Sequence, residues 1–402
     1  TLYVANPGNT TVNVKVTAWG ASGEISLPSD GQLSIAPGKA TQLALENSAD
    51  ADPQLALRVQ AEGGRVAAWV ASQKLDGESA AGSDIITSTA SAGTSLTIGA
   101  LSIDKAASQI TPQAAAADAA ATPSPSAAAS ATATPSAKAS AKASAKASSA
   151  AKASATPSAK ASAKATAKPS ATATPSATAT TAAATPSPSA SADSLDLSGA
   201  LNEPRLRVLN PGDKTAHVKV TLLGKSGPVQ FAPASGLNVK AGQVADLPLG
   251  GLAQGTYGVK IDSDQPVSAA ALSTSQGSEY PELSGQHIHD FTWSQAQTGQ
   301  GGVAMLPRQD VTSQLLLTNP SAQPKQVTLS AIGSNWTSTL TLPALSTQVA
   351  QVPESVQAVS VSGAVPATLV SRETSGDQAG TLISVIDRIE VTEATAQRRI
   401  RL

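Results

Sequence analysis

The sequence predicts an all-β protein in which β-sandwich domains follow one another in tandem. Three observations predict this fold: apolar and polar residues alternate in many short segments, turn signals separate these segments, and one motif occurs three times. Alternation with a period of two is typical of strands that bury one face. Short strands at regular spacing, with no helical pattern between them, are typical of sandwiches.

The repeated motif is a hydrophobic segment that ends in Asn-Pro, followed by a second alternating segment and a Gly. Between Leu2 and Gly23, a fixed shift of 204 positions aligns 13 identical residues out of 22 with the second copy, without a gap. The third copy lies 109 positions further on. Because each copy must be one structural unit, we expect equivalent strands at 2–5 and 12–19, 206–209 and 218–223, and 315–318 and 327–332.

Each Asn-Pro step is expected to fix a turn between two strands. Pro cannot donate a hydrogen bond to a sheet ladder, and the residue before it is pushed toward extended geometry. The Asn side chain can bond nearby backbone as an Asx turn, although a binding role for it is the alternative. The structural turn residues are Asn6, Pro7, Asn210, Pro211, Asn319 and Pro320. The predicted core positions are Val14, Val16, Val218, Val220, Val327 and Leu329.

The motif divides the chain into three β-sandwich repeats, at 1–103, 195–300 and 301–402, with a spacer at 104–194. The chain has no Cys, so each repeat must bury enough apolar surface by itself, and about 100 residues is adequate for that. Aromatic residues make up only 2% of the sequence. We therefore expect cores of Val, Leu, Ile and Ala.

The spacer is predicted to be disordered. Residues 111–192 consist almost wholly of Ala, Ser, Thr, Pro and Lys, and no large apolar side chain offsets the entropy of ordering them. This segment holds seven Lys and one acidic residue, Asp118, whereas the rest of the chain has 20 basic and 27 acidic residues. Its sparse positive charge can hold it near anionic polymers. Nucleic-acid binding is a weaker hypothesis, because no aromatic residue is interleaved for stacking.

No motif for catalysis occurs: the sequence has no Gly-x-Ser-x-Gly elbow, no phosphate-binding glycine loop and no Cys-x-x-Cys pair. We therefore expect no enzyme, no catalytic residue and no cofactor. His287 and His289 fall on one face of a predicted strand beside Asp290, which makes a weak metal site conceivable. A third ligand cannot be named, so no metal site is predicted. Residues 262–264 lack the Gly and the distant Glu of a calcium loop and are expected to form a hairpin turn.

The Trp residues are the best candidates for ligand contact, since indole faces stack well on sugar rings. Trp336 and Trp293 lie in loop-like stretches and are the weak candidates for such a contact. Trp19 and Trp69 are expected in a core or an interface. The positions equivalent to Trp19 are apolar in every copy of the motif.

The strings at 206–212, 218–220, 255–259 and 267–270 resemble an uncharacterised actinobacterial family of large secreted proteins, domain of unknown function family 5719. The likeness covers most of the chain outside the spacer, which departs from the compact pattern of the family. The strand-Asn-Pro-Gly-strand motif also recurs in other immunoglobulin-like envelope and adhesion domains, so immunoglobulin-like sandwiches are expected. The resemblance implies export and an envelope location. It brings no known activity and no catalytic residue.

We therefore expect a non-enzymatic, secreted or cell-envelope scaffold or interaction module whose partner is an unknown protein or a cell-wall polymer. The alternative is a carbohydrate-binding array on cell-wall glycans, and polyanion or nucleic-acid binding through the spacer comes third. No apolar run approaches the 18 or so residues of a membrane span, so no transmembrane segment is predicted. The chain opens at Thr1 inside a predicted strand, which suggests that its amino terminus has been removed.

Overall fold

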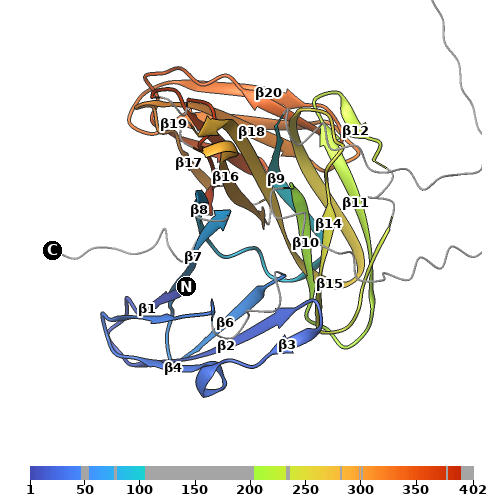
Figure 1. Ribbon diagram of the computed structural model, residues 1–402. Helices are drawn as coiled ribbons and strands as arrows, with labels where there is room; N and C mark the ends of the chain where they lie inside the picture. Colours follow the sequence, from blue (N-terminus) through green and yellow to red (C-terminus); the bar gives the residue numbers. More distant parts are fainter. Residues whose placement is uncertain are drawn as a thin grey trace, which may run out of the picture. The chain divides into compact units, whose positions relative to one another are not determined.

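The structure is a computed structural model of the chain (Figure 1). It describes residues 1–46, 54–76, 79–104, 203–231, 236–280, 283–297, 299, 302–376 and 379–390. The elements in these ranges are strands β1 to β25 and one short 3-10 helix, Pro28–Gly31. The predicted all-β fold is confirmed, while nearly all of the predicted spacer lies outside the described residues. In the described part, no helix is long and apolar enough to cross a membrane.

The first sandwich consists of two four-stranded sheets that enclose an aliphatic core. One sheet has the order β5-β1-β7-β8, formed by Ala40–Leu43, Leu2–Ala5, Ala67–Asp76 and Ser79–Ile86. In the other sheet, the central strand β2 pairs with β3, β4 and β6, and these four span Val12–Gly20, Gly23–Ile25, Gln32–Ile35 and Ala56–Glu62. The side chains between the sheets include Leu2, Val4, Val14, Val16, Ile35 and Leu43.

The second sandwich is built around one long strand, β15 (Gly255–Tyr280). Its first half pairs with β11 (Ala216–Gly224), and its second half pairs with β10 (Arg205–Asn210) and β16 (Leu283–Gln297). Strand β15 therefore contributes to both walls of the sandwich. The remaining strands are β12 (Gly227–Val229), β13 (Leu237–Val239) and β14 (Gln243–Pro248).

Strand β9 (Gly93–Ile103) belongs to the second sandwich, although the sequence analysis places these residues in the first repeat. It pairs with β15 and β16, and its residues Ile98 and Leu101 are fully buried in the second core. All residues from 96 to 103 are buried, so both faces of the strand are covered. A continuous buried run of this kind needs a partner layer on each side, and the second and third sandwiches supply those layers.

The third sandwich again has two sheets. One has the order β20-β19-β22-β17-β25, formed by Thr337–Leu342, Lys325–Ala331, Ala358–Ser362, Gly302–Met305 and Ile389–Glu390. The other has the order β21-β18-β23-β24, formed by Ser346–Ala350, Val311–Asn319, Ala367–Glu373 and Ile383–Asp387. All six predicted strands occur in the three sandwiches, and all six predicted core residues are buried.

The Asn-Pro steps form the same hydrogen-bonded turn in each sandwich. The Asn6 amide nitrogen donates to the carbonyl oxygens of Thr10, at 2.8 Å, and Ile35, at 2.9 Å, and its Oδ1 accepts from the Gly8 N–H at 2.9 Å. Ile35 ends β4 in the opposite sheet. A single buried side chain thus closes its own turn and ties the two layers together.

Asn210 and Asn319 repeat this arrangement, and their side chains are fully buried. Each amide donates to the carbonyl four residues ahead and to the end of a strand across the sandwich, at Val239 and Leu342 respectively. Each Oδ1 also accepts from the N–H two residues ahead. A buried amide that is satisfied on both sides explains why the motif keeps Asn at this point.

We predict that Asn210→Ala destabilises the second sandwich by about 2–4 kcal/mol, because three hydrogen bonds are lost and buried carbonyls stay unpaired. Chemical denaturation monitored by circular dichroism measures the change. The control is Asn238→Ala, which alters an exposed Asn on β13 of the same sandwich. Equal midpoints for both variants would contradict the role given to Asn210.

Candidate functional site

The two Trp residues predicted as ligand contacts lie in different sandwiches, and both are half-buried. Trp336 packs against the core of the third sandwich. Trp293, on β16, lies under the Arg207 guanidinium, whose central carbon is 5.0 Å from the ring centroid. The structure therefore gives each indole a packing partner within the chain.

The histidines are spread along two strands. His287 Nδ1 lies 3.2 Å from the Gly277 carbonyl oxygen on the neighbouring strand. His217 Nδ1 lies 2.7 Å from Asp264 Oδ2, and its backbone N–H donates to Oδ1 of the same carboxylate at 2.8 Å. These bonds lower the pKa of Asp264. Within the described ranges, no three His, Cys, Asp or Glu residues are grouped so that they could hold a metal ion.

The most elaborate polar arrangement lies where three strands meet, one from each sandwich. These strands are β8, β16 and β24, and we call their meeting place the edge junction. Strands β8 and β24 end their own sheets, and β16 lies against both. An edge strand presents unpaired backbone N–H groups that must find partners when they are buried. At the edge junction, the carboxylates of Asp84, Asp290 and Asp387 accept hydrogen bonds from these N–H groups.

Asp84, on β8, binds the outer edge of β16. Its Oδ2 accepts from the Trp293 backbone N–H at 2.7 Å, and its Oδ1 accepts from the Thr292 hydroxyl at 3.4 Å. Burial raises the pKa of Asp84 to about 6, against the opposing effect of these hydrogen bonds. The carboxylate therefore joins the first sandwich to the second at an appreciable desolvation cost when it is ionised.

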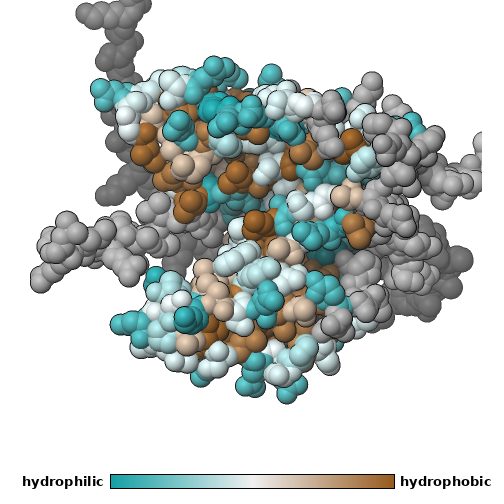
Figure 2. All heavy atoms as spheres, turned by 60° about the vertical axis from the view of Figure 1, so that its left-hand side comes forward, coloured by the Kyte–Doolittle hydropathy of each residue, from teal (hydrophilic) through white to brown (hydrophobic). Residues whose placement is uncertain are grey.

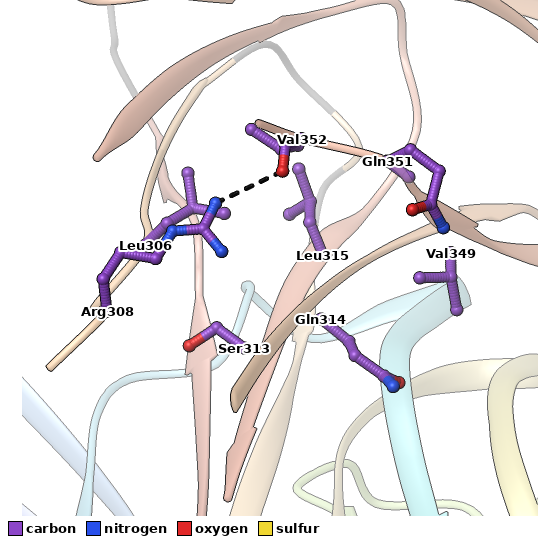
Figure 3. Close-up of a pocket in the computed structure, with 9 residues that line it drawn as sticks. Leu306, Arg308, Ser313, Gln314, Leu315, Val349, Gln351 and Val352 are labelled. Carbon is purple, nitrogen blue, oxygen red and sulfur yellow. Dashed lines mark hydrogen bonds between the residues drawn. The ribbon is translucent and has the colours of Figure 1, made fainter. Parts of the chain in front are cut away.

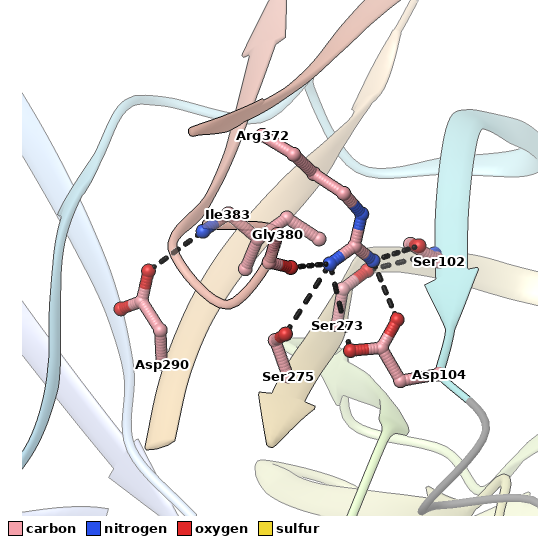
Figure 4. Close-up of polar contacts among 8 residues, drawn as sticks. All are labelled: Ser102, Asp104, Ser273, Ser275, Asp290, Arg372, Gly380 and Ile383. Carbon is pink, nitrogen blue, oxygen red and sulfur yellow. Dashed lines mark hydrogen bonds and ion pairs between the residues drawn. The ribbon is translucent and has the colours of Figure 1, made fainter. Parts of the chain in front are cut away.

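Asp290, on β16, binds strands of the other two sandwiches. Its Oδ2 accepts from the Ile383 N–H of β24 at 2.8 Å (Figure 4). A bond from the Ser83 N–H of β8 opposes the rise that burial causes in the pKa of Asp290. Gly82 makes this approach possible, because a Cβ there would lie 2.6 Å from Asp290 Oδ1.

Asp387, on β24, completes the edge junction. Its Oδ2 accepts from the Gln295 N–H of β16 at 2.8 Å. Its Oδ1 accepts from the Thr368 hydroxyl at 2.8 Å and from the Gln297 amide at 2.7 Å. Burial raises the pKa of Asp387 as well. The second and third sandwiches are thus joined by side-chain bonds in place of a backbone ladder.

An Arg-centred cluster adjoins the edge junction (Figure 4). Arg372, on β23, holds Asp104 in a two-oxygen ion pair, with the shorter N–O distance at 2.6 Å. Its guanidinium also donates to the hydroxyls of Ser102 and Ser275 and to the Gly380 carbonyl. Asp104 directly follows β9, so the cluster fastens the end of β9 to the third sandwich.

Small residues allow the second and third sandwiches to approach closely. Three glycines of the second sandwich face threonines of the third: Gly99 and Thr368, Gly258 and Thr347, and Gly277 and Thr381. A Cβ on any of these glycines would lie between 2.1 and 2.5 Å from the threonine hydroxyl oxygen. The gap is bridged by hydrogen bonds, including Thr318 Oγ1 to the Gly99 carbonyl and the Gly258 N–H to Thr347 Oγ1, both 2.9 Å.

The first and second sandwiches meet at Trp19, as the sequence analysis expects of a core or interface residue. Its side chain is 6% exposed and packs against Leu209 and Val244 of the second sandwich. Beside it, Arg207 forms two 2.8 Å bonds to the buried Asp246 and donates to the Leu55 carbonyl at 3.0 Å. The guanidinium thus spans the two sandwiches.

A recess of about 170 Å³ lies at one end of the third sandwich (Figure 3). Arg308 reaches across it and donates to the Val352 carbonyl, and Ser313 donates to the Pro307 carbonyl. Ligand sites usually enclose about 300–1,000 Å³, so this recess is small. Its serine has a backbone carbonyl and Ser371 as partners, neither of which is a base.

The three junction carboxylates are not among the site residues that the sequence predicts. A signal was present, because each Asp stands in a strand directly beside a large apolar residue, which is Ile85, Phe291 or Ile386. Asp is depleted in strands, so its occurrence in three strands needed an explanation. The sequence does not show which groups these three carboxylates bind, because the partner strands come from distant parts of the chain.

We predict that raising the pH weakens the edge junction through Asp84. Its pKa rises from 3.8 to about 6 on folding, so its contribution is fully present below pH 3.8 and is lost as the pH passes 6. The loss amounts to about 3 kcal/mol. Asp84→Asn should flatten this part of the curve. Urea unfolding of both proteins from pH 4 to 7 measures it, and parallel curves would contradict the prediction.

We predict that Gly258→Val separates the third sandwich from the second. The added side chain would collide with Thr318 and Thr347, and overpacking of about 1–3 kcal/mol raises the separated population roughly 5- to 150-fold. Hydrogen exchange of β18 and β21 reports this opening. The control is Gly236→Val, which has open space around its Cβ position. Unchanged exchange in Gly258→Val would refute the close approach.

Comparison with known proteins identifies one family. The model of a family described as "Family of unknown function (DUF5719)" matches residues 1–183 and 171–353, in two tandem copies. No curated protein and no solved structure matches the chain. The two matches agree with the internal repeat seen in the sequence and in the Asn-Pro turns. The chain therefore belongs to this family of unknown function.

Proposed function

We propose that this chain is a non-enzymatic scaffold or interaction module that works at the cell envelope or outside the cell. The observation that carries the proposal is the set of buried polar contacts between the sandwiches. At the edge junction and the Arg372 cluster, charged groups bind backbone, hydroxyl groups or each other. Buried polar networks whose groups are all satisfied favour one specific arrangement of the parts that they join, which is what a scaffold requires.

The same contacts argue against catalysis as the role of these groups. A catalytic acid or base must reach a substrate, whereas each carboxylate of the edge junction accepts a backbone N–H at 2.7 or 2.8 Å. Their raised pKa values have a structural cause, since burial raises them against the opposing effect of the hydrogen bonds. The proposed location rests on the export that the family resemblance implies, with an unknown protein or a cell-wall polymer as the partner.

The alternative, a carbohydrate-binding array that uses Trp336 or Trp293, has weaker support. Both indoles already have packing partners within the chain. A nucleic-acid role through the Lys-bearing spacer remains third, because its charge is sparse.

The described strands on either side of the predicted spacer pair with one and the same strand. Ile103, the last residue of β9, pairs with Gly255 and Thr274 of β15, and Arg205, the first residue of β10, pairs with Leu272 of the same strand. A chain of moderate length can therefore connect them. This arrangement fits a long insertion between two neighbouring strands, which folded domains tolerate well.

We predict that deletion of 111–192 leaves the thermal unfolding of the sandwiches nearly unchanged and removes salt-sensitive adhesion to anionic cell-wall polymers. Co-sedimentation with purified actinobacterial cell walls at low and high NaCl measures the adhesion. The full chain should sediment at low salt and the deleted chain should not. Release of soluble wall fragments by the full chain would contradict a non-enzymatic role, and equal sedimentation would contradict the role of the spacer.

A further inference from the structure

The outward face of the sheet β5-β1-β7-β8 carries an unusual pair of residues. On β1, Leu2 and Val4 point into the core and are buried, so Tyr3 and Ala5 point the other way. Tyr3 is opposite Trp69 of β7. Their rings stack with centroids 5.6 Å apart and planes inclined by 7°. Both side chains are half-buried, so part of the pair is open to solvent.

The pair is preorganised by its position in the sheet. Stacked aromatic rings stabilise one another beyond the area that they bury, and both residues belong to regular strands. The rings therefore hold each other in place before any ligand arrives. This separates Trp69 from Trp19, which is enclosed by the second sandwich.

The cross-strand partners of the pair are small and uncharged. The nearest charges are the Thr1 ammonium, which donates to the Ala71 carbonyl at 3.1 Å, and Glu46, with which the ammonium forms an ion pair at 3.4 Å. Across the sheet, Gln42 is opposite Tyr3, while Ala40 and Ala67 are opposite Ala5. Next to them on the same face, Ala71 is opposite Ile85, which is 67% exposed. Gln42 and Gln73 are exposed as well. Short alanine side chains leave room beside the rings, and the two amides offer both donors and acceptors.

The residues around the aromatic pair favour some classes of ligand over others. The cross-strand partners of the pair carry no charge that could bind a phosphate or a carboxylate, and the Thr1 ammonium already has Glu46 as its partner. A protein partner would need a large continuous contact surface, because protein interfaces of standard size bury about 800 Å² on each partner. Figure 2 turns forward the side on which Figure 1 labels β1, β7 and β8, and hydrophobic side chains form separate patches there between polar ones. A neutral ligand with a flat apolar face and a hydroxyl rim fits this surface best.

We propose that the Tyr3–Trp69 face binds a neutral polysaccharide. The C–H face of one pyranose ring packs on the aromatic pair, and the amides of Gln42 and Gln73 bond hydroxyl groups of that ring or its neighbours. Ile85 extends the apolar contact along the sheet. The site goes beyond the scaffold role and uses none of the contacts between sandwiches, so either idea can fail without the other.

The test titrates the full chain with cellohexaose, chitohexaose and xylohexaose, by calorimetry and by intrinsic fluorescence. We expect saturable binding of at least one of the three. If ring stacking contributes here what base stacking does elsewhere, about 1–3 kcal/mol, then Trp69→Leu weakens binding roughly 5- to 150-fold. Trp69→Tyr should keep most of the affinity, because it restores a flat ring.

The matched control is Trp336→Leu, which removes an indole from the third sandwich and should leave the affinity unchanged. Circular dichroism checks that each variant folds. If Trp69→Leu does not fold, the exposed pair Gln42→Ala and Gln73→Ala carries the test and should also weaken binding. The proposal is overturned if the full chain binds none of the three sugars, if Trp336→Leu alone abolishes binding, or if the variants of this face bind as tightly as the unaltered chain.

Discussion

Backbone groups at the ends and edges of β-sheets must be satisfied once they are buried, and this constraint organises the structure. Where a strand turns, a buried Asn supplies both donor and acceptor, as at Asn6, Asn210 and Asn319. Where two sheets meet edge to edge, Asp carboxylates accept the free N–H groups. Side chains thus continue a hydrogen-bond network that the ladders leave incomplete.

The buried Asn amides and the buried Asp carboxylates respond differently to pH. A buried amide is neutral and binds equally well at any ordinary pH, so each sandwich is closed by a bond that does not titrate. A buried carboxylate becomes costly to keep once it ionises. Contacts inside a sandwich and contacts between sandwiches therefore depend differently on pH, although both use short acidic or amide side chains of similar size.

Much of the fold could be predicted from the sequence. Val14, Val16, Val218 and Val220 stand two residues apart on strands that bury one face, and a period of two is a local property. The Asn-Pro turns are local too, since their first bonds join residues two and four positions apart. Structural features that depend only on neighbours within a few residues could therefore be predicted from the sequence.

The rest depended on contacts between distant segments. Strand β9 is buried from residue 96 to residue 103, polar Thr97 and Ser102 included, and its sequence would equally suit a strand of its own repeat, so only its partners reveal where it belongs. The sequence predicts that Trp69 lies in a core or an interface, yet its side chain lies on the outward face beside Tyr3. Glycines such as Gly258 look like turn or bulge signals until the opposing threonines are known.

The placement of β9 has a consequence for how this protein can be divided. The second core is completed by residues 93–103, which precede Arg205 by about a hundred positions. Closing a loop of that length costs about 4 kcal/mol in chain entropy by the logarithmic rule. A fragment cut at the sequence repeats would lack this strand and expose a long edge on β15, and such edges recruit strands from other molecules. Dissection of this chain into single repeats thus favours swapped dimers or aggregates, whereas a fragment that starts before Gly93 retains a closed second sandwich.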